Sequence, residues 1–549
     1  MAVGELESLG YIDKDGNGIV DVNGDVQNYA WDSNTNTRRR IASAPPQDLY
    51  RAPQPAPITP GTEAYDRIVE SQFKRVAQDP LSTFSIDVDT AAYSNMRRFI
   101  TQGQMPPVNA VRIEELINYF NYDYPQPTGE DPFSSNIEVA SAPWNPQHKL
   151  VRIGLKGKDI VAEERPASNL VFLLDVSGSM SSHNKLPLVK QSIRMLTQQL
   201  TAHDRVAIVV YAGNSGLVLP STAGNNHQAI ITALDRLNAG GSTNGGAGIE
   251  LAYRVAAENF IDGGVNRVIL ATDGDFNVGN TGRNGLVQQI ESSAKTGVFL
   301  SVLGFGMGNL KDATMENLAD KGNGNYAYID TFHEAKKVLV DQMNGTLFTI
   351  AKDVKIQVEF NPNRVQSYRL IGYENRALAN RDFNDDTKDA GEIGAGHTVT
   401  ALYEIVPKGV SATMPQPGVD GLRYAPVQEE EAIAKPLGDV VMGQELLTVK
   451  LRYKQPDGNE SKLLEFHVSD TNANYNEAST DFKFATAVAL FGMKLRHSPF
   501  AQHMSYDTVL QLAQGSVGHD LNGYRSEFLG LVQQAKGMNP QPRYEQYKQ

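Results

Sequence analysis

The sequence predicts an α/β protein built around a doubly wound, mostly parallel sheet, and two observations carry this prediction. Between residues 166 and 348, short apolar runs alternate with amphipathic windows, which is typical of strands joined by helices. Strand-like segments also lie on both sides of this unit. We therefore expect the sheet to be inserted in, or clasped by, a β-sandwich with additional helices. The strands expected in the parallel sheet are residues 170–175, 206–211, 267–272, 298–304 and 326–329.

The first strand and the helix after it have the clearest signals. The run NLVFLL is short, bulky and apolar and ends on Asp175, as expected of a strand buried on both faces. Pro187 suits the first turn of a helix. The apolar residues of that helix recur at three- and four-residue spacing: Val189, Ile193, Leu196 and Leu200.

The rest of the chain divides into flanking regions. We expect an acidic segment resembling a calcium loop at 1–30, a linker rich in Pro and Ala at 31–62, a helical plus strand region at 63–165, and a β-rich then helical region at 349–549. Further helices are predicted at 63–79, 91–101, 111–120, 482–495 and 505–512. Further strands are predicted at 136–146, 149–157, 353–360, 398–406, 445–454 and 462–468.

Composition excludes several classes of function. The chain has 549 residues and a net charge of −13, which disfavours nucleic acid and anionic membranes as partners. It has no Cys, so disulfides, thiolate metal sites and Cys nucleophiles are excluded. No apolar run reaches the roughly 18 residues of a membrane span, and residues 1–25 lack a signal-peptide pattern. We expect either a cytoplasmic protein or one whose signal was removed.

The strand-to-helix loop after residue 174 carries the first functional signal. Asp175, Ser177 and Ser179 form D-x-S-x-S, so alternate residues can direct three oxygens toward one point. Two other loops are candidates to complete an oxygen-only shell, with Thr243 in GGSTNGGAG and Asp273 at the end of LAT. Oxygen ligands suit a hard cation such as Mg²⁺. A plain helix-capping loop is the alternative interpretation of the first motif alone.

These five residues resemble the metal-ion-dependent adhesion site of von Willebrand factor type A (VWA) domains. The resemblance implies that Ser177 and Ser179 coordinate Mg²⁺ or Mn²⁺ directly and that Asp175 and Asp273 act mostly through waters. Thr243 would enter or leave the shell with the conformational state. The implied partner is a protein that presents an Asp or Glu carboxylate to the metal.

The flanks resemble bacterial YfbK-type proteins over roughly residues 65–540. The segments that carry this resemblance include STFSIDVDTAAYSNMRRF, AVRIEELINYFNYDYP and RDFNDDTKDAGEIGAGHTVTALYEIVP. The resemblance implies a protein of the cell envelope, periplasmic or on the surface and often lipid-anchored, with flanking regions of unknown role.

The predicted function is metal-dependent protein binding of the adhesion type, not catalysis. DVSGS is not the G-x-S-x-G of a nucleophile elbow, the Gly-rich loop lacks a phosphate-binding lysine, and H-E-x-x-H is absent. One alternative is a scaffold or assembly subunit whose metal stabilises the fold. A weaker alternative is a metal-assisted hydrolase, for which no general base is evident. The oligomeric state is left open.

A second cation site is a candidate near the N-terminus. The segment DKDGNGIVDVNGD, residues 13–25, resembles EF-hand and dockerin-type calcium loops, with Gly18 at the sharp turn. It departs from them at Gly24, where a bidentate Glu would stand. An acidic, turn-rich tail is the alternative. The possible Ca²⁺ ligands are Asp13, Asp15, Asn17, Ile19, Asp21 and Asp25.

Two other acidic clusters have simpler interpretations. Asp89 or Thr90 is expected to be the N-cap of the helix that starts at Ala91. The run between Asp382 and Glu392 lies in a segment with little apolar content, and we expect it to be a solvated loop more than a metal site.

Overall fold

The computed structural model describes residues 29–32, 37–40, 63–86, 89–161, 164–212, 215–241, 245–274, 282–307, 310–388, 390–410, 444–456 and 458–538. The chain divides into two compact units, residues 1–60 and 61–549. In the first unit, β1 (Tyr29–Asp32) and β2 (Thr37–Arg40) form an antiparallel pair that overlaps the expected linker. The candidate calcium loop at 13–25 lies outside the described residues. Among the described helices, none has the length and apolar character to cross a membrane.

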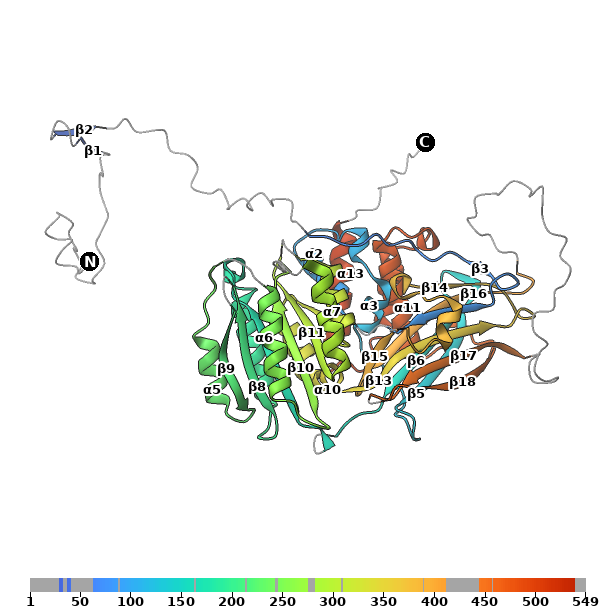
Figure 1. The fold of residues 1–549 in the computed structure, drawn as a ribbon. Helices are drawn as coiled ribbons and strands as arrows, with labels where there is room; N and C mark the ends of the chain where they lie inside the picture. The colour runs from blue at the N-terminus through green and yellow to red at the C-terminus, as the bar shows by residue number, and fades with distance from the viewer. Residues whose placement is uncertain are drawn as a thin grey trace. The chain divides into compact units, whose positions relative to one another are not determined.

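A six-stranded sheet forms the α/β part of the second unit, in the order β12-β11-β10-β7-β8-β9 (Figure 1). Its parallel strands are β7 (Ser168–Asp175), β8 (Arg205–Tyr211), β10 (Val265–Thr272), β11 (Val298–Phe305) and β12 (Tyr326–Ile329). All five lie where the sequence predicts them. The sixth, β9 (Ser215–Ala223), pairs antiparallel with β8 at one edge and was not predicted. The predicted fold class, a mostly parallel doubly wound sheet, is confirmed.

Helices cover both faces of this sheet because its five parallel strands are buried on both faces. Leu170, Phe172 and Leu174 pack in one cluster with the apolar stripe of α4 (Leu186–Thr197), which includes Val189, Ile193 and Leu196. Val171 and Leu173 pack on the opposite face with α6 (Gly245–Glu258) and α7 (Gly282–Lys295) (Figure 1). The other helices are α5 (His227–Asp235), α8 (Asp312–Lys321), α9 (Phe332–Lys336), the π-helical turn η5 (Lys337–Asp341) and α10 (Met343–Leu347).

Two antiparallel sheets pack face to face as a sandwich, and each takes strands from both sides of the α/β unit. One contains β4 (Leu81–Ser85), β13 (Thr349–Phe360), β15 (Gly391–Gly394), β17 (Glu445–Lys454) and β18 (Ser461–Ser469). The other contains β3 (Lys74–Arg75), β5 (Phe133–Ala142), β6 (Asn145–Gly157), β14 (Val365–Ile371) and β16 (Thr398–Pro407). Because β4 pairs with β13 and β6 pairs with β16, the chain leaves the sandwich, forms the α/β unit and returns. The predicted clasp by both flanks is confirmed.

A helical layer joins the two flanks. It consists of α2 (Ala91–Thr101), α3 (Ile113–Asn118), α11 (Thr480–Leu495), α12 (Tyr506–Gln514) and α13 (Tyr524–Met538). These helices share one apolar core, in which nearly every residue of α11 is buried. Four of the five match the predicted helices, and α13 was not predicted.

The helix predicted for residues 63–79 is wrong. The segment is extended and contributes β3 to the second sheet. Its polar side chains make tertiary contacts that a helix would not allow: Glu63 accepts two hydrogen bonds from Arg98, and Tyr65 accepts one from Asn95. Side-chain contacts with α2 therefore outweigh the weak helical pattern of the segment.

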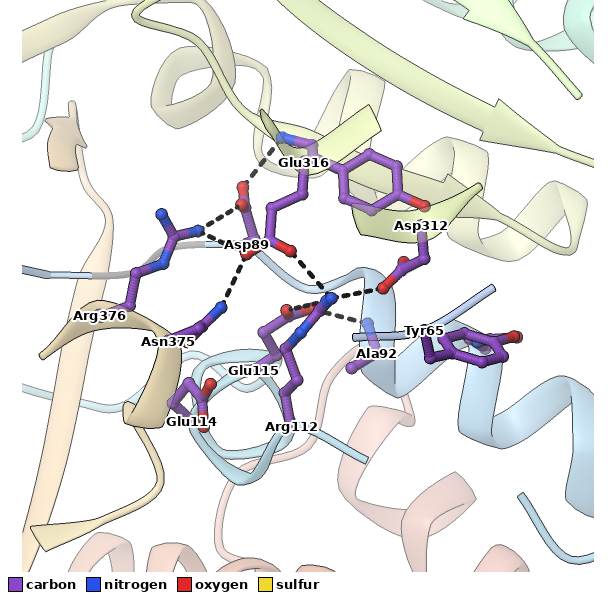
Figure 2. Close-up of polar contacts among 12 residues, drawn as sticks. Tyr65, Asp89, Ala92, Arg112, Glu114, Glu115, Asp312, Glu316, Asn375 and Arg376 are labelled. Carbon is purple, nitrogen blue, oxygen red and sulfur yellow. Dashed lines mark hydrogen bonds and ion pairs between the residues drawn. The ribbon is translucent and has the colours of Figure 1, made fainter. Parts of the chain in front are cut away.

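Buried ion pairs hold the flanks against the α/β unit. Arg112, just before α3, pairs with Asp312 and Glu316 of α8 at 2.5 and 2.8 Å. Arg376, in the sandwich, pairs with Glu316 at 3.1 Å and with Asp89 at 3.2 Å. Figure 2 shows these carboxylates gathered around the two guanidinium groups. Charges buried together in this way are stable only while all partners remain.

The same cluster corrects the expected helix cap. Thr90 occupies the N-cap position of α2, but its side chain makes no capping hydrogen bond. The Asp89 carboxylate instead accepts from the backbone N–H of Tyr326 at 2.9 Å. The N–H of Ala92 in the first turn donates to Glu115 of α3 at 2.7 Å, so a carboxylate from a neighbouring helix caps α2 (Figure 2).

Replacing Arg112 by Met tests the buried cluster. The substitution leaves the carboxylates of Asp312, Glu115 and Glu316 buried without their shared cation, so we expect the free energy of unfolding to fall by about 3–5 kcal/mol. Urea denaturation measures this. Arg254→Met is the matched control, because Arg254 pairs with Glu250 on the exposed face of α6, and its loss should cost about 0.5 kcal/mol or less. Equal effects of the two substitutions would contradict the role given to Arg112.

Candidate metal centre

Adjacent parallel strands bring the predicted site residues to one edge of the sheet. Strand β7 ends at Asp175 and its neighbour β10 ends at Thr272, with Leu174 opposite Ala271 in the register. Asp273 follows directly, so both acids lie at the carboxyl ends of neighbouring strands. This edge is where open α/β sheets bind their ligands.

The carboxylate of Asp175 is buried and hydrogen-bonded at both oxygens. Oδ1 accepts from the backbone N–H of Ser177 at 2.9 Å. Oδ2 accepts from the hydroxyl of Thr272 at 3.1 Å and from the phenol of Tyr211 at 3.2 Å. With its oxygens engaged in this way, Asp175 acts on the site as a fixed negative charge and holds the loop in place.

Electrostatics at this edge favour a cation. Burial raises the pKa of Asp175 above its ordinary value, and the charge of Asp273 acts in the same direction. The hydrogen bonds from Ser177 and Thr272 act in the opposite direction. Two carboxylates this close in a buried setting repel each other, and a nearby positive charge relieves the repulsion.

The side chains of Ser177 and Ser179 lie next to each other in the loop after β7. Ser177 is buried and Ser179 is half-buried at the start of the 3-10 turn η3 (Gly178–Ser181). Their hydroxyl oxygens are 3.0 Å apart. Met180, within this turn, is buried in the apolar cluster that also contains residues of α4, and this burial anchors the turn.

The loop before α6, which contains Gly240 and Gly241, is held against the loop after β7 by backbone hydrogen bonds. The N–H of Gly240 donates to the carbonyl of Val176 at 2.7 Å, and the N–H of Gly178 donates to the carbonyl of Gly241 at 3.1 Å. Thr243 lies outside the described residues. At the start of α6, a Cβ on Gly248 would lie 2.8 Å from the Cβ of Tyr211, so only glycine lets the helix approach β8 this closely.

Sequence reasoning missed one charged residue of the site, Lys185. Its ammonium donates to Asp273 Oδ2 at 2.8 Å, and both side chains are buried. Lys185 stands at the N-cap position of α4, ten residues after Asp175. A single lysine before a helix is ordinarily a surface residue, so its position in the sequence held no signal for this role.

The donor set fits a hard divalent cation. Hydroxyl and carboxylate oxygens are the ligands that Mg²⁺ prefers, and its bonds to them are about 2.0–2.1 Å long in octahedral geometry. Two adjacent oxygens on such an ion lie about 2.9 Å apart. The Ser177 and Ser179 hydroxyls already have nearly this spacing. The Asp273 carboxylate is already paired with the ammonium group of Lys185.

The acidic run after Asp382 has the contacts of a structural loop. Among the described residues, no group of three or more His, Asp or Glu side chains is arranged to hold a metal ion. In the run after Asp382, Lys355 donates to the carbonyls of Asp382 and Asp385, and the Asp386 carboxylate accepts from the N–H of Ser461. The hydrogen bonds of this acidic run are therefore those of a loop that is bonded to neighbouring strands.

The six-stranded sheet and the loops at its strand ends form a von Willebrand factor type A domain. The family profile described by that name matches residues 169–342, and a profile described as von Willebrand factor matches residues 59–152. Among solved structures, the von Willebrand factor type A protein from Catenulispora acidiphila is similar over 75% of this chain and 92% of that one, with 15% identity and a TM-score of 0.40.

The chain belongs to the YfbK family. It is 46% identical over 486 residues to the uncharacterized protein YfbK of Escherichia coli (strain K12), covering 87% of this chain and 82% of that protein. The profile described as the C-terminal region of uncharacterized protein YfbK matches residues 345–538. A more distant relative, uncharacterized protein sll0103 of Synechocystis sp., is 29% identical over 36% of this chain and 45% of its own length.

Replacing Thr272 by Val tests how the site holds its buried carboxylate. The change keeps the shape of the side chain but removes one donor to Asp175, and the N–H of Gly274 loses its acceptor as well. We expect a loss of about 1–3 kcal/mol in the free energy of unfolding without metal. Thr222→Val in the half-exposed edge strand β9 is the control. It removes a solvent-accessible hydrogen bond to the carbonyl of Pro220 and should change stability by less than about 0.5 kcal/mol. If both variants unfold alike in urea, Thr272 does not support Asp175.

Proposed function

We propose that this protein binds a partner protein through a divalent cation, Mg²⁺ or Mn²⁺, held at the carboxyl edge of its VWA sheet. Ser177 and Ser179 would coordinate the ion directly, Asp175 and Asp273 would neutralise it, and Thr243 would complete the shell. The ion would supply an exchangeable position that a carboxylate of the partner fills. The observation that carries this proposal is the 3.0 Å spacing of the two hydroxyls above a buried, fully hydrogen-bonded Asp175.

Hydroxyl ligands make such an ion a strong acceptor for an outside carboxylate. A neutral oxygen donates little charge to the metal, so most of its positive charge remains for the partner. Oδ2 of Asp175 already accepts hydrogen bonds from Tyr211 and Thr272, so this oxygen is not free to bond the ion directly. This arrangement favours capture of an Asp or Glu from another protein.

Binding is better supported than catalysis. The carboxylates of Asp175 and Asp273 are already engaged, Asp175 with hydrogen-bond donors and Asp273 with Lys185. Neither is positioned as the general base that a metal-assisted hydrolysis would need. We therefore propose a non-enzymatic protein, and phosphatase and peptidase substrates should remain unhydrolysed in its presence.

A scaffold function is the second candidate, and the buried ion pairs support it. Arg112, Arg376 and their carboxylate partners fasten the VWA domain to both flanks, as in a rigid assembly subunit. In that case the metal would stabilise the fold and partners would bind the flanks. The resemblance to YfbK-type proteins supports a location in the cell envelope for either function, with the cytoplasm as the alternative.

Metal-dependent unfolding tests the proposed site. Without metal and then with Mg²⁺, Mn²⁺ or Ca²⁺ added separately, thermal unfolding of the wild type should shift upward with Mg²⁺ and Mn²⁺. At 100 times the dissociation constant the gain is about 2.7 kcal/mol. The shift should disappear in Asp175→Ala and in the milder double variant Ser177→Ala with Ser179→Ala.

Asp262→Ala is the matched control for this experiment, because Asp262 is exposed at the opposite end of β10. It should keep the full Mg²⁺ shift. A shift that persists in both site variants would place the metal elsewhere in the chain. No shift in the wild type would remove the support for metal-dependent adhesion and leave the scaffold function.

A further inference from the structure

The stem of Lys185 lies in a slot formed by the backbone of a glycine, Gly306. The residue after β11, Gly306, has φ of +78°, which favours glycine. A Cβ at this position would lie 2.2 Å from Cε of Lys185, 2.5 Å from Cγ and 2.8 Å from Cδ. The stem of the lysine thus lies directly on the backbone of Gly306, and its ammonium is delivered to Asp273 at 2.8 Å. A third strand end, that of β11, therefore helps to shape the metal centre.

Lys185 adds one positive charge to the metal centre. Asp175 and Asp273 bring two negative charges, and Lys185 brings one positive charge, so the metal-free centre has a net charge of −1. A divalent cation changes this to +1, and one carboxylate from a partner then makes the centre neutral. Without Lys185, the metal-loaded centre would already be neutral and a partner carboxylate would make it negative.

We propose that Lys185 is a built-in countercharge that weakens metal binding and strengthens binding of one carboxylate to the metal-loaded centre. This inference rests on the proposed metal site and assigns to Lys185 the control of its charge. The two effects have opposite signs because the ammonium repels the cation and attracts the anion. A lysine that only stabilised the local fold would not change the two affinities in opposite directions.

The test compares the wild type with Lys185→Met, which keeps an unbranched stem in the Gly306 slot and removes the charge. Mn²⁺ is titrated first, followed by electron paramagnetic resonance of free Mn²⁺. Acetate is then titrated into the Mn²⁺-loaded protein, and its displacement of metal-bound water is followed by proton relaxation. We expect the dissociation constant for Mn²⁺ to fall, and that for acetate to rise, each by at least about tenfold.

Two further variants make the result decisive. Lys185→Gln is neutral but can still donate a hydrogen bond to Asp273, so it should show the same two changes even if the Met variant folds poorly. Lys190→Met is the matched control, because Lys190 lies one turn further along α4 and donates to the carbonyls of Asp235 and Leu237, away from the site. It should keep both wild-type affinities.

The outcomes separate this inference from the proposed function. If the wild type binds no Mn²⁺ at this centre, the proposed function fails, and the inference fails with it. If the wild type binds Mn²⁺ but the neutral variants bind Mn²⁺ or acetate with unchanged affinity, the metal site stands and the countercharge is overturned. Tighter Mn²⁺ binding together with weaker acetate binding supports the inference.

Discussion

The burial of two carboxylates side by side is the constraint on which the centre of this protein depends. Asp175 and Asp273 end neighbouring strands and are almost inaccessible to solvent. Buried charges of the same sign are costly unless donors or cations compensate them. The surroundings supply both: Ser177, Thr272 and Tyr211 donate to Asp175, and Lys185 pairs with Asp273. A divalent cation bound at the proposed site would complete the same compensation, so the proposed metal site and the stability of this sheet edge would have one physical origin.

The flanking regions contact a part of the VWA domain other than the edge that carries Asp175 and Asp273. Strands from both sides of the domain share the two sheets of the sandwich, and Arg112 and Arg376 bring their buried charges to α8 and to the start of α2 (Figure 2). The candidate metal centre lies instead on β7, β10 and the loops that follow them. The elements that carry these ion pairs are therefore separate from the strand ends that would hold the metal, which is compatible with a binding module built into a rigid frame.

Much of the fold could be predicted because its strands are either fully buried or regularly alternating. The five parallel strands are continuous apolar runs, and a run such as 169–174 has few other interpretations. Strand β9 was missed because it is a half-exposed edge strand that contains Pro220. Residues 63–79 were assigned wrongly because contacts with α2, which are invisible in the local pattern, decide their conformation.

The candidate site could be predicted only in part. The spacing of Asp175, Ser177 and Ser179 and the strand end before Asp273 are local features that a sequence displays. The roles of Lys185 and Gly306 depend on which strand ends become neighbours and on a backbone angle at Gly306, neither of which is local. The role of Tyr211 could not be predicted either, because the sequence indicates only a core aromatic residue, whereas its hydroxyl donates to Asp175.

The most direct test of the central claim is the anomalous scattering of crystals grown with Mn²⁺. The account predicts one strong anomalous peak within bonding distance, about 2.1–2.2 Å, of the hydroxyl oxygens of Ser177 and Ser179, with Asp175 still hydrogen-bonded to Thr272. A structure at saturating Mn²⁺ in which this position has no peak, with the serine hydroxyls still bonded only to each other, would contradict it.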